Sequence, residues 1–126
     1  MQLSRHTDLA IRLLVQLAAE PGAQMTIAQV AQDQAVPQPY LMKIANALAH
    51  AGFIATTRGR GGGVSLARPA AEIRIGEVVR AMEPQSEIVR CSECLLAPRC
   101  KLPRHLGRAM QAFYRVLDEQ TLEDVI

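Results

Sequence analysis

All three cysteines of this 126-residue chain lie in one ten-residue segment, at Cys91, Cys94 and Cys100. Thiolates are soft ligands that bind iron–sulfur clusters or zinc, so the spacing Cys-x2-Cys-x5-Cys offers three ligands for such a site. In a reducing compartment such a group is more typical of a metal site than of disulfide bonds, and an odd number cannot pair completely. Arg90 and Arg99 stand beside the cysteines, and neighbouring cations favour the ionised thiol. The segment therefore predicts a site for a metal or a metal cluster.

The cysteine spacing does not identify the fourth ligand of this site. His105 lies five residues beyond Cys100 and could complete a Cys3His set, which is also a familiar set for structural zinc. The alternative is that His105 is a solvent-exposed residue on a helix surface. Both an iron–sulfur cluster and zinc suit these residue types, so the spacing indicates a soft metal without selecting which one.

A second group of residues points to nucleic acid. The formal net charge is only +2, but no carboxylate occurs between Asp33 and Glu72, a window that contains Lys43, Arg58, Arg60 and Arg68. One local surface should therefore be positive although the whole chain is nearly neutral, as in proteins that bind phosphate backbones.

The pattern within this window predicts a helix-turn-helix followed by a wing. Thr26 begins a short helix to about residue 32, and Pro37 opens another helix that Gly52 ends. Strand-like residues at 53–57 and 64–67 enclose a glycine-rich turn, which predicts a hairpin. A recognition helix exposes hydrogen-bonding side chains, and a glycine-rich tip lets backbone and arginine approach the duplex. The candidate DNA-binding residues are Thr26, Gln38, Tyr40, Lys43, Arg58, Arg60, Gly61 and Gly62. A helix-turn-helix that binds protein, with a merely flexible hairpin tip, is the alternative.

The remaining segments complete a mainly α fold with a small β-hairpin wing. Residues 4–19 predict a largely buried first helix, 73–82 a short helix, and 85–101 a loop. A long last helix starts at Pro103. Its apolar residues at coiled-coil spacing predict pairing with the same helix of a second subunit, and they are Leu102, Leu106, Ala109, Phe113 and Val116. We divide the chain into a winged helix-turn-helix domain (1–83), a cysteine-rich loop (84–101) and a dimerisation helix with tail (102–126).

Composition and motifs exclude several other classes of protein. No stretch approaches the roughly 20 apolar residues of a membrane span, and no cleavable signal pattern is found, so we expect a cytoplasmic protein. There is no nucleophile–base arrangement and no phosphate-binding loop opening a helix, so an enzyme is not expected. An electron-transfer protein would use the cysteines but would leave the helix-turn-helix unexplained.

The order of these features resembles the iron–sulfur winged-helix transcription regulators of the NsrR/IscR family, over essentially the whole chain. The resemblance lies in Thr7-Asp8 with Arg12, in Tyr40-Leu41, in the motif RGRGGG at 58–63, in IRIGEVV at 73–79, in the cysteine loop and in TLED at 121–124. The NsrR branch is nearest, because the segment LAPRCKL at 96–102 and the position of Asp8 are similar to it.

This resemblance implies a repressor with an iron–sulfur cluster held by Cys91, Cys94 and Cys100. Asp8, donated from the other subunit of a homodimer, would be the fourth ligand, although it is also four residues before Arg12 and so spaced for a helical ion pair. The cluster would be [4Fe–4S], in preference to [2Fe–2S]. Nitric oxide would attack it and release the repressor from an inverted-repeat operator. The alternatives are a regulator that senses iron supply or redox state, as IscR-like proteins do, and a winged-helix regulator stabilised by zinc.

Overall fold

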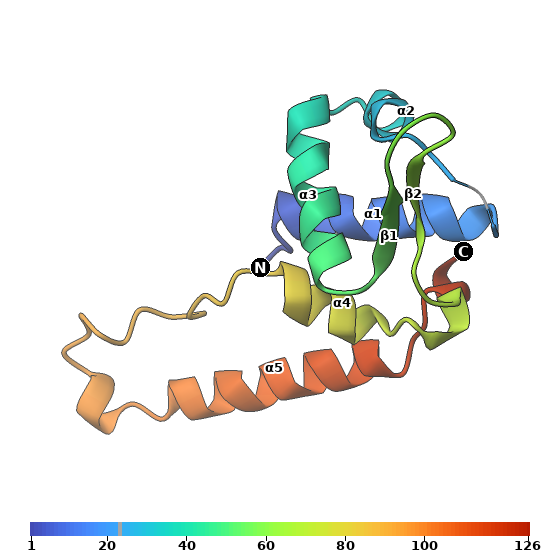
Figure 1. Ribbon diagram of the computed structural model, residues 1–126. Helices are drawn as coiled ribbons and strands as arrows, with labels where there is room; N and C mark the ends of the chain where they lie inside the picture. Colours follow the sequence, from blue (N-terminus) through green and yellow to red (C-terminus); the bar gives the residue numbers. More distant parts are fainter. Residues whose placement is uncertain (23) are drawn as a thin grey trace.

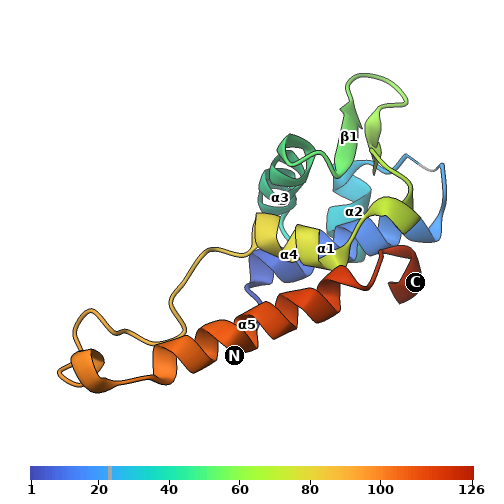
Figure 2. The ribbon, with the colours of Figure 1, turned by 90° about the horizontal axis from the view of Figure 1, so that it is seen from below.

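The computed structural model describes residues 1–22 and 24–126. The elements follow in the order α1 (Arg5–Ala19), α2 (Ile27–Asp33), α3 (Gln38–His50), β1 (Ile54–Thr57), β2 (Gly63–Leu66), α4 (Ile75–Met82) and α5 (Leu102–Asp118), with 3-10 turns at Ala70–Glu72, Ala97–Arg99 and Glu123–Val125. The first four helices and the hairpin form one body, and α5 extends to one side of it with the cysteine segment at its far end (Figures 1 and 2). In this described part of the chain, no helix is long and apolar enough to cross a membrane.

Helix α1 lies in the centre of the core because apolar residues cover most of its circumference. The side-chain oxygen of Ser4 caps its start by accepting a hydrogen bond from the Thr7 amide at 3.2 Å. Helices α3 and α4 and strand β2 all pack against α1. The buried residues of α1 are Thr7, Leu9, Ala10, Leu13, Leu14, Leu17 and Ala18.

The predicted helix-turn-helix is present as α2 and α3. The Thr26 hydroxyl oxygen accepts a hydrogen bond from the Gln29 amide at 3.1 Å and so caps α2. Ala35 adopts a left-handed backbone conformation (φ 52°), which turns the chain between the two helices. Leu41, Ile44 and Leu48 of α3 are buried against the rest of the core. Their spacing fixes which face of α3 remains exposed to solvent.

The predicted wing is present as the antiparallel hairpin of β1 and β2, with Ile54 opposite Leu66 and Thr57 opposite Gly63. Val64 also pairs with Met25, which ties the hairpin to the segment before α2. The turn needs glycine because Gly61 has a positive φ (71°) and a Cβ at Gly62 would collide with the backbone oxygen of Thr57. The bridge between Val64 and Met25 lies at the start of β2, so the hairpin is held close to its turn, and the glycine-rich tip projects from the body (Figure 2).

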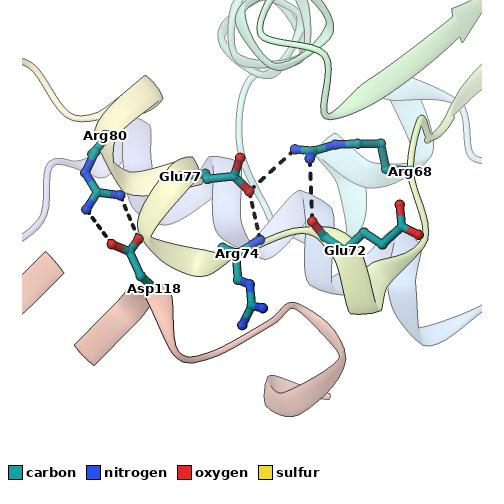
Figure 3. Close-up of polar contacts among 6 residues, drawn as sticks. All are labelled: Arg68, Glu72, Arg74, Glu77, Arg80 and Asp118. Carbon is teal, nitrogen blue, oxygen red and sulfur yellow. Dashed lines mark hydrogen bonds and ion pairs between the residues drawn. The ribbon is translucent and has the colours of Figure 1, made fainter. Parts of the chain in front are cut away.

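An ion pair joins α4 to the end of α5. Arg80 donates two hydrogen bonds of 2.6 Å to the carboxylate of Asp118 (Figure 3). Its guanidinium also lies 4.7 Å from the centre of the Tyr114 ring. The pKa of Asp118 is lowered from its usual value, chiefly by the hydrogen bonds from Arg80. Gly76 faces this pair at close range, since a Cβ there would overlap the Asp118 side chain. The last turn of α5 is thereby anchored to the body.

The last helix differs in two respects from what the pattern predicts. It begins at Leu102, one residue before the proline, and the five apolar residues of its predicted seam do not share one environment. Phe113 packs against the core of its own chain, whereas Leu102 and Val116 are 50% and 56% exposed. A helix that covers α4 with one side must turn part of its apolar surface inward. Only the outward residues are then free to contact another chain.

Two glycine substitutions should have opposite effects on stability. Gly76→Ala should lower the free energy of unfolding, because the new Cβ displaces Asp118 from Arg80. Gly107→Ala in α5 should raise it by about 0.5–1 kcal/mol, because no atom lies within 4 Å of the added Cβ and alanine favours the helix. Denaturant unfolding of both variants measures this difference, and a stabilised Gly76→Ala would contradict the close packing described here.

Candidate functional site

The outward face of α3 carries the side chains expected of a recognition helix. Lys43 is exposed on the side opposite the buried leucines and isoleucine, Asn46 extends the same polar surface, and Gln38 is exposed in the first turn. Tyr40 is half-buried, with part of its ring against the core. A helix with this arrangement can present hydrogen-bond donors and acceptors to the edges of base pairs.

The wing carries the second part of the candidate DNA interface. Arg58, Arg60 and Gly61 are exposed at its tip, and Gly62 is half-exposed beside them. Neither arginine makes an ion pair with any residue that the structure describes, so both charges are available to phosphate. Thr26 is also exposed, but its hydroxyl oxygen is occupied as the cap of α2.

Two residues near this surface are not recognisable from sequence. The guanidinium of Arg5, at the start of α1, lies 5.8 Å from the centre of the Tyr40 ring. The carboxylate of Glu83, which follows α4, accepts hydrogen bonds from the backbone amide of Ser4 at 3.0 and 3.1 Å. These residues are far apart in the chain, and no periodicity or spacing links them.

Successive turns bring the cysteine segment into a compact loop. The Cys94 amide donates to the Cys91 carbonyl, the Ala97 amide to the Cys94 carbonyl, and the Cys100 amide to the Ala97 carbonyl, at 3.2, 3.2 and 3.4 Å. Hydrogen bonds of this i to i+3 type tend to bring side chains three residues apart to the same side. All three cysteines are free thiols, with Cys91 half-exposed and the other two exposed. Nothing in the loop's own packing requires thiols at these positions.

The chemistry of these donors fits a soft metal, but one chain does not assemble a complete ligand set. Among the described residues, no three histidine, cysteine or carboxylate groups converge on one possible metal position. Asp8 lies on α1 and makes the helical ion pair with Arg12, with an Oδ2–Nη2 distance of 2.8 Å. His105 is exposed on α5, one turn before Arg108. The structure therefore gathers the cysteines on one loop and leaves both candidates for the fourth ligand outside it.

Comparison with known proteins identifies relatives over almost the full chain. Residues 3–126 match the Rrf2 family model, which is described as "Iron-dependent Transcriptional regulator". The oxidised form of Staphylococcus aureus CymR is 28% identical with a TM-score of 0.79, covering 99% of this chain and 95% of that one. CymR of B. subtilis, described as the global cysteine regulator, is 27% identical with a TM-score of 0.78 and the same coverage. IscR of T. potens shares the fold at a TM-score of 0.80, with 23% identity over 99% of this chain and 85% of that one.

These matches agree with the helix-turn-helix, the wing and the long last helix observed here, and they confirm the predicted winged-helix architecture. The chain belongs to the Rrf2 family of transcriptional regulators, which bind DNA and are not enzymes.

Proposed function

We propose that this chain is a homodimeric repressor whose cysteine loop binds an iron–sulfur cluster, and whose release from an inverted-repeat operator is caused by nitric oxide. The observation that carries the proposal is the concentration of all three thiols, accessible to solvent, on a loop that leads directly into α5. Family membership supplies the DNA-binding part, and the cysteine loop supplies a place for the signal. The resemblance to the NsrR branch supports nitric oxide as that signal.

The DNA-binding part rests on two elements with exposed positive residues, the recognition helix α3 and the wing. Lys43 lies on the exposed face of α3, and Arg58 and Arg60 lie on the wing, which is tethered to the segment before α2. The recognition helix would enter the major groove while the wing arginines contact phosphates or the adjacent minor groove. Two copies related by a twofold axis would read two half-sites of an inverted repeat.

Arg60→Ala should weaken DNA binding through the loss of a phosphate contact. We expect the slope of log K against log salt to fall by about 0.9, the value for one phosphate neutralised on duplex DNA. Fluorescence anisotropy with a labelled duplex at several salt concentrations measures this slope. Arg74→Ala is the matched control, since this exposed arginine immediately precedes α4 and lies outside both α3 and the wing. Equal slopes for both variants would remove the wing from the interface.

The dimer rests on the outward side of α5. Leu102 and Val116 are 50% and 56% exposed there, and none of the residues of α5 is buried in its own chain. Charge is also uneven along the helix. Lys101 precedes the helix and Arg104 and Arg108 lie in its first half, whereas one arginine, Arg115, lies near its end and Glu119 and Glu123 follow it. An antiparallel pair of such helices would cover the apolar residues and place opposite charges side by side.

Val116→Glu should therefore shift the dimer toward monomer, because a carboxylate would be placed within the apolar contact. Sedimentation velocity over a range of protein concentrations measures the dissociation constant, and we expect it to rise at least tenfold. Gln111→Glu introduces the same charge at an exposed position and is the control. A variant at Val116 that dimerises like wild type would place the interface elsewhere.

The cluster site would use Cys91, Cys94 and Cys100, with the partner subunit's Asp8 completing it. A bound cluster would supply iron and sulfide atoms that react with nitric oxide. The chain's own part is to carry the three thiols on one short loop, with Arg90 and Arg99 beside them in the sequence. For Asp8 to act as a ligand, its carboxylate must give up all or part of its exposed ion pair with Arg12, which is a weak interaction at the surface. His105 remains the alternative fourth ligand.

Cys100→Ala should abolish cluster binding, because it removes one of three thiolates. The measurements are the visible absorption spectrum and the iron and sulfide contents of anaerobically purified protein. Ser92→Ala is the control, because it changes an exposed residue of the same loop without removing a thiol. It should keep the visible absorption and the iron and sulfide contents of wild type. Full colour in Cys100→Ala would refute the ligand assignment. A colourless wild-type protein that contains zinc would instead leave DNA binding standing and remove the nitric-oxide mechanism.

Titrations of the wild-type protein with its cluster bound distinguish nitric oxide from the alternative signals. The family description as iron-dependent supports iron supply, and the solved structure of an oxidised CymR, 28% identical to this chain, supports redox state. Titration with nitric oxide should bleach the spectrum and release DNA at stoichiometric amounts. Release by iron chelation or by a thiol oxidant, with no response to nitric oxide, would select one of those alternatives.

A further inference from the structure

We propose that Arg5 is a further DNA-contacting residue and that Glu83 is the positioning residue that holds it beside the recognition helix. This inference deepens the proposed DNA-binding function and depends on it. It concerns the first turn of α1, where three distant parts of the chain meet: the end of α4, the start of α1 and the start of α3.

Glu83 holds the first turn of α1 by several short hydrogen bonds. Its carboxylate accepts from the Ser4 amide at 3.0 and 3.1 Å and from the Ser4 hydroxyl at 3.0 Å. Ser4 in turn caps α1 through the Thr7 amide, and the Thr7 hydroxyl lies 3.0 Å from that of Ser4. Thr7 is fully buried, so this polar group is fixed against the core. A negative charge at a helix start also interacts favourably with the helix dipole.

The charge state of Glu83 agrees with this geometry. Partial burial by itself would raise its pKa, but hydrogen bonds from Thr7 and Ser4 outweigh that effect, and the pKa lies below its usual value. Glu83 therefore remains an acceptor at neutral pH. The backbone amide of Glu83 donates a hydrogen bond to the Val79 carbonyl at 2.8 Å, which fixes the backbone of this residue at the end of α4.

Arg5 follows Ser4 directly, and its direction is set by the same turn. Its guanidinium stacks over Tyr40, in the first turn of α3, at 5.8 Å from the ring centre. Stacking on an aromatic face leaves the N–H donors at the edge of the guanidinium free. Arg5 is exposed and makes no ion pair within residues 1–22 and 24–126, and the nearby Asp8 is paired with Arg12. A free cation thus stands beside the candidate residues of the recognition helix.

This arrangement places Arg5 where a phosphate would pass. A duplex whose major groove receives the first turn of α3 brings its backbone past both sides of that helix. The wing arginines would contact the DNA backbone on one side of α3, and Arg5 would contact it on the other side. Glu83 is also the C-cap of α4, and the cysteine-rich loop begins at the next residue, so the loop is attached at the same point that orients this contact.

The test is the salt dependence of binding to duplex DNA of random sequence, with full-length protein whose cysteines are kept reduced. Arg5→Ala should lower the slope of log K against log salt by about 0.9. Glu83→Ala removes a negative charge, and electrostatics alone would strengthen binding to DNA. Because Glu83 positions Arg5, we expect the opposite, a several-fold weakening. The double variant should bind no more weakly than Arg5→Ala, and Glu83→Gln, which keeps an acceptor oxygen, should retain most of the affinity.

Glu87→Ala is the matched control, since it removes an exposed carboxylate from the adjoining segment and should leave binding unchanged or slightly stronger. The proposal is overturned if Glu83→Ala behaves like Glu87→Ala, or if Arg5→Ala keeps the wild-type slope. Should Glu83→Ala fail to fold, Glu83→Gln and the surface variant Arg5→Ala still decide the result. Loss of affinity in Arg60→Ala with none in Arg5→Ala would reject this inference while leaving the DNA-binding function intact.

Discussion

The burial of α1 constrains the placement of the other elements of the body. Its leucines are covered on several sides at once, by α3, by α4 and by β2. Each of these elements has too little apolar surface to be stable alone, and each is stabilised by packing on the same helix. The recognition helix, the wing and the point where the cysteine loop begins therefore share one support. A displacement at either end of α1 has to be accommodated by the elements packed on it.

Helix α5 is held differently. Its C-terminal end is anchored by Arg80–Asp118, and the following tail returns to the core through Leu122, which is fully buried. The other end lies away from the body beside the cysteine loop (Figure 1), and Leu102 there is 50% exposed. The contrast is typical of an element whose remaining partner is another molecule. Anchoring one end gives α5 a defined direction, which a dimer would need if it is to set the distance between two recognition helices.

Positive and negative side chains are also distributed unevenly over the molecule. The long segment without carboxylates maps onto the exposed side of α3 and onto the wing, where Lys43, Arg58 and Arg60 face solvent, whereas Arg68 pairs with Glu77. Acidic residues elsewhere are engaged locally, as Asp8 is with Arg12, Asp118 with Arg80 and Asp124 with Thr121. A nearly neutral chain can therefore present a positive surface, because its negative groups are paired or placed away from that surface.

Local pattern was sufficient to predict the helix-turn-helix, the hairpin and the exposed side of α3. Caps such as Thr26, the glycines of the wing tip and helical spacing of buried residues act over a few positions, so the sequence by itself determined these elements and the nature of the candidate DNA surface. It also placed all thiols on one loop. Only the tertiary structure decided that Phe113 turns inward while Val116 faces out, and that Glu83, Ser4, Arg5 and Tyr40 meet. The reason is physical: these contacts join residues from separate elements, and their distances depend on how the helices pack around α1 rather than on any spacing along the chain.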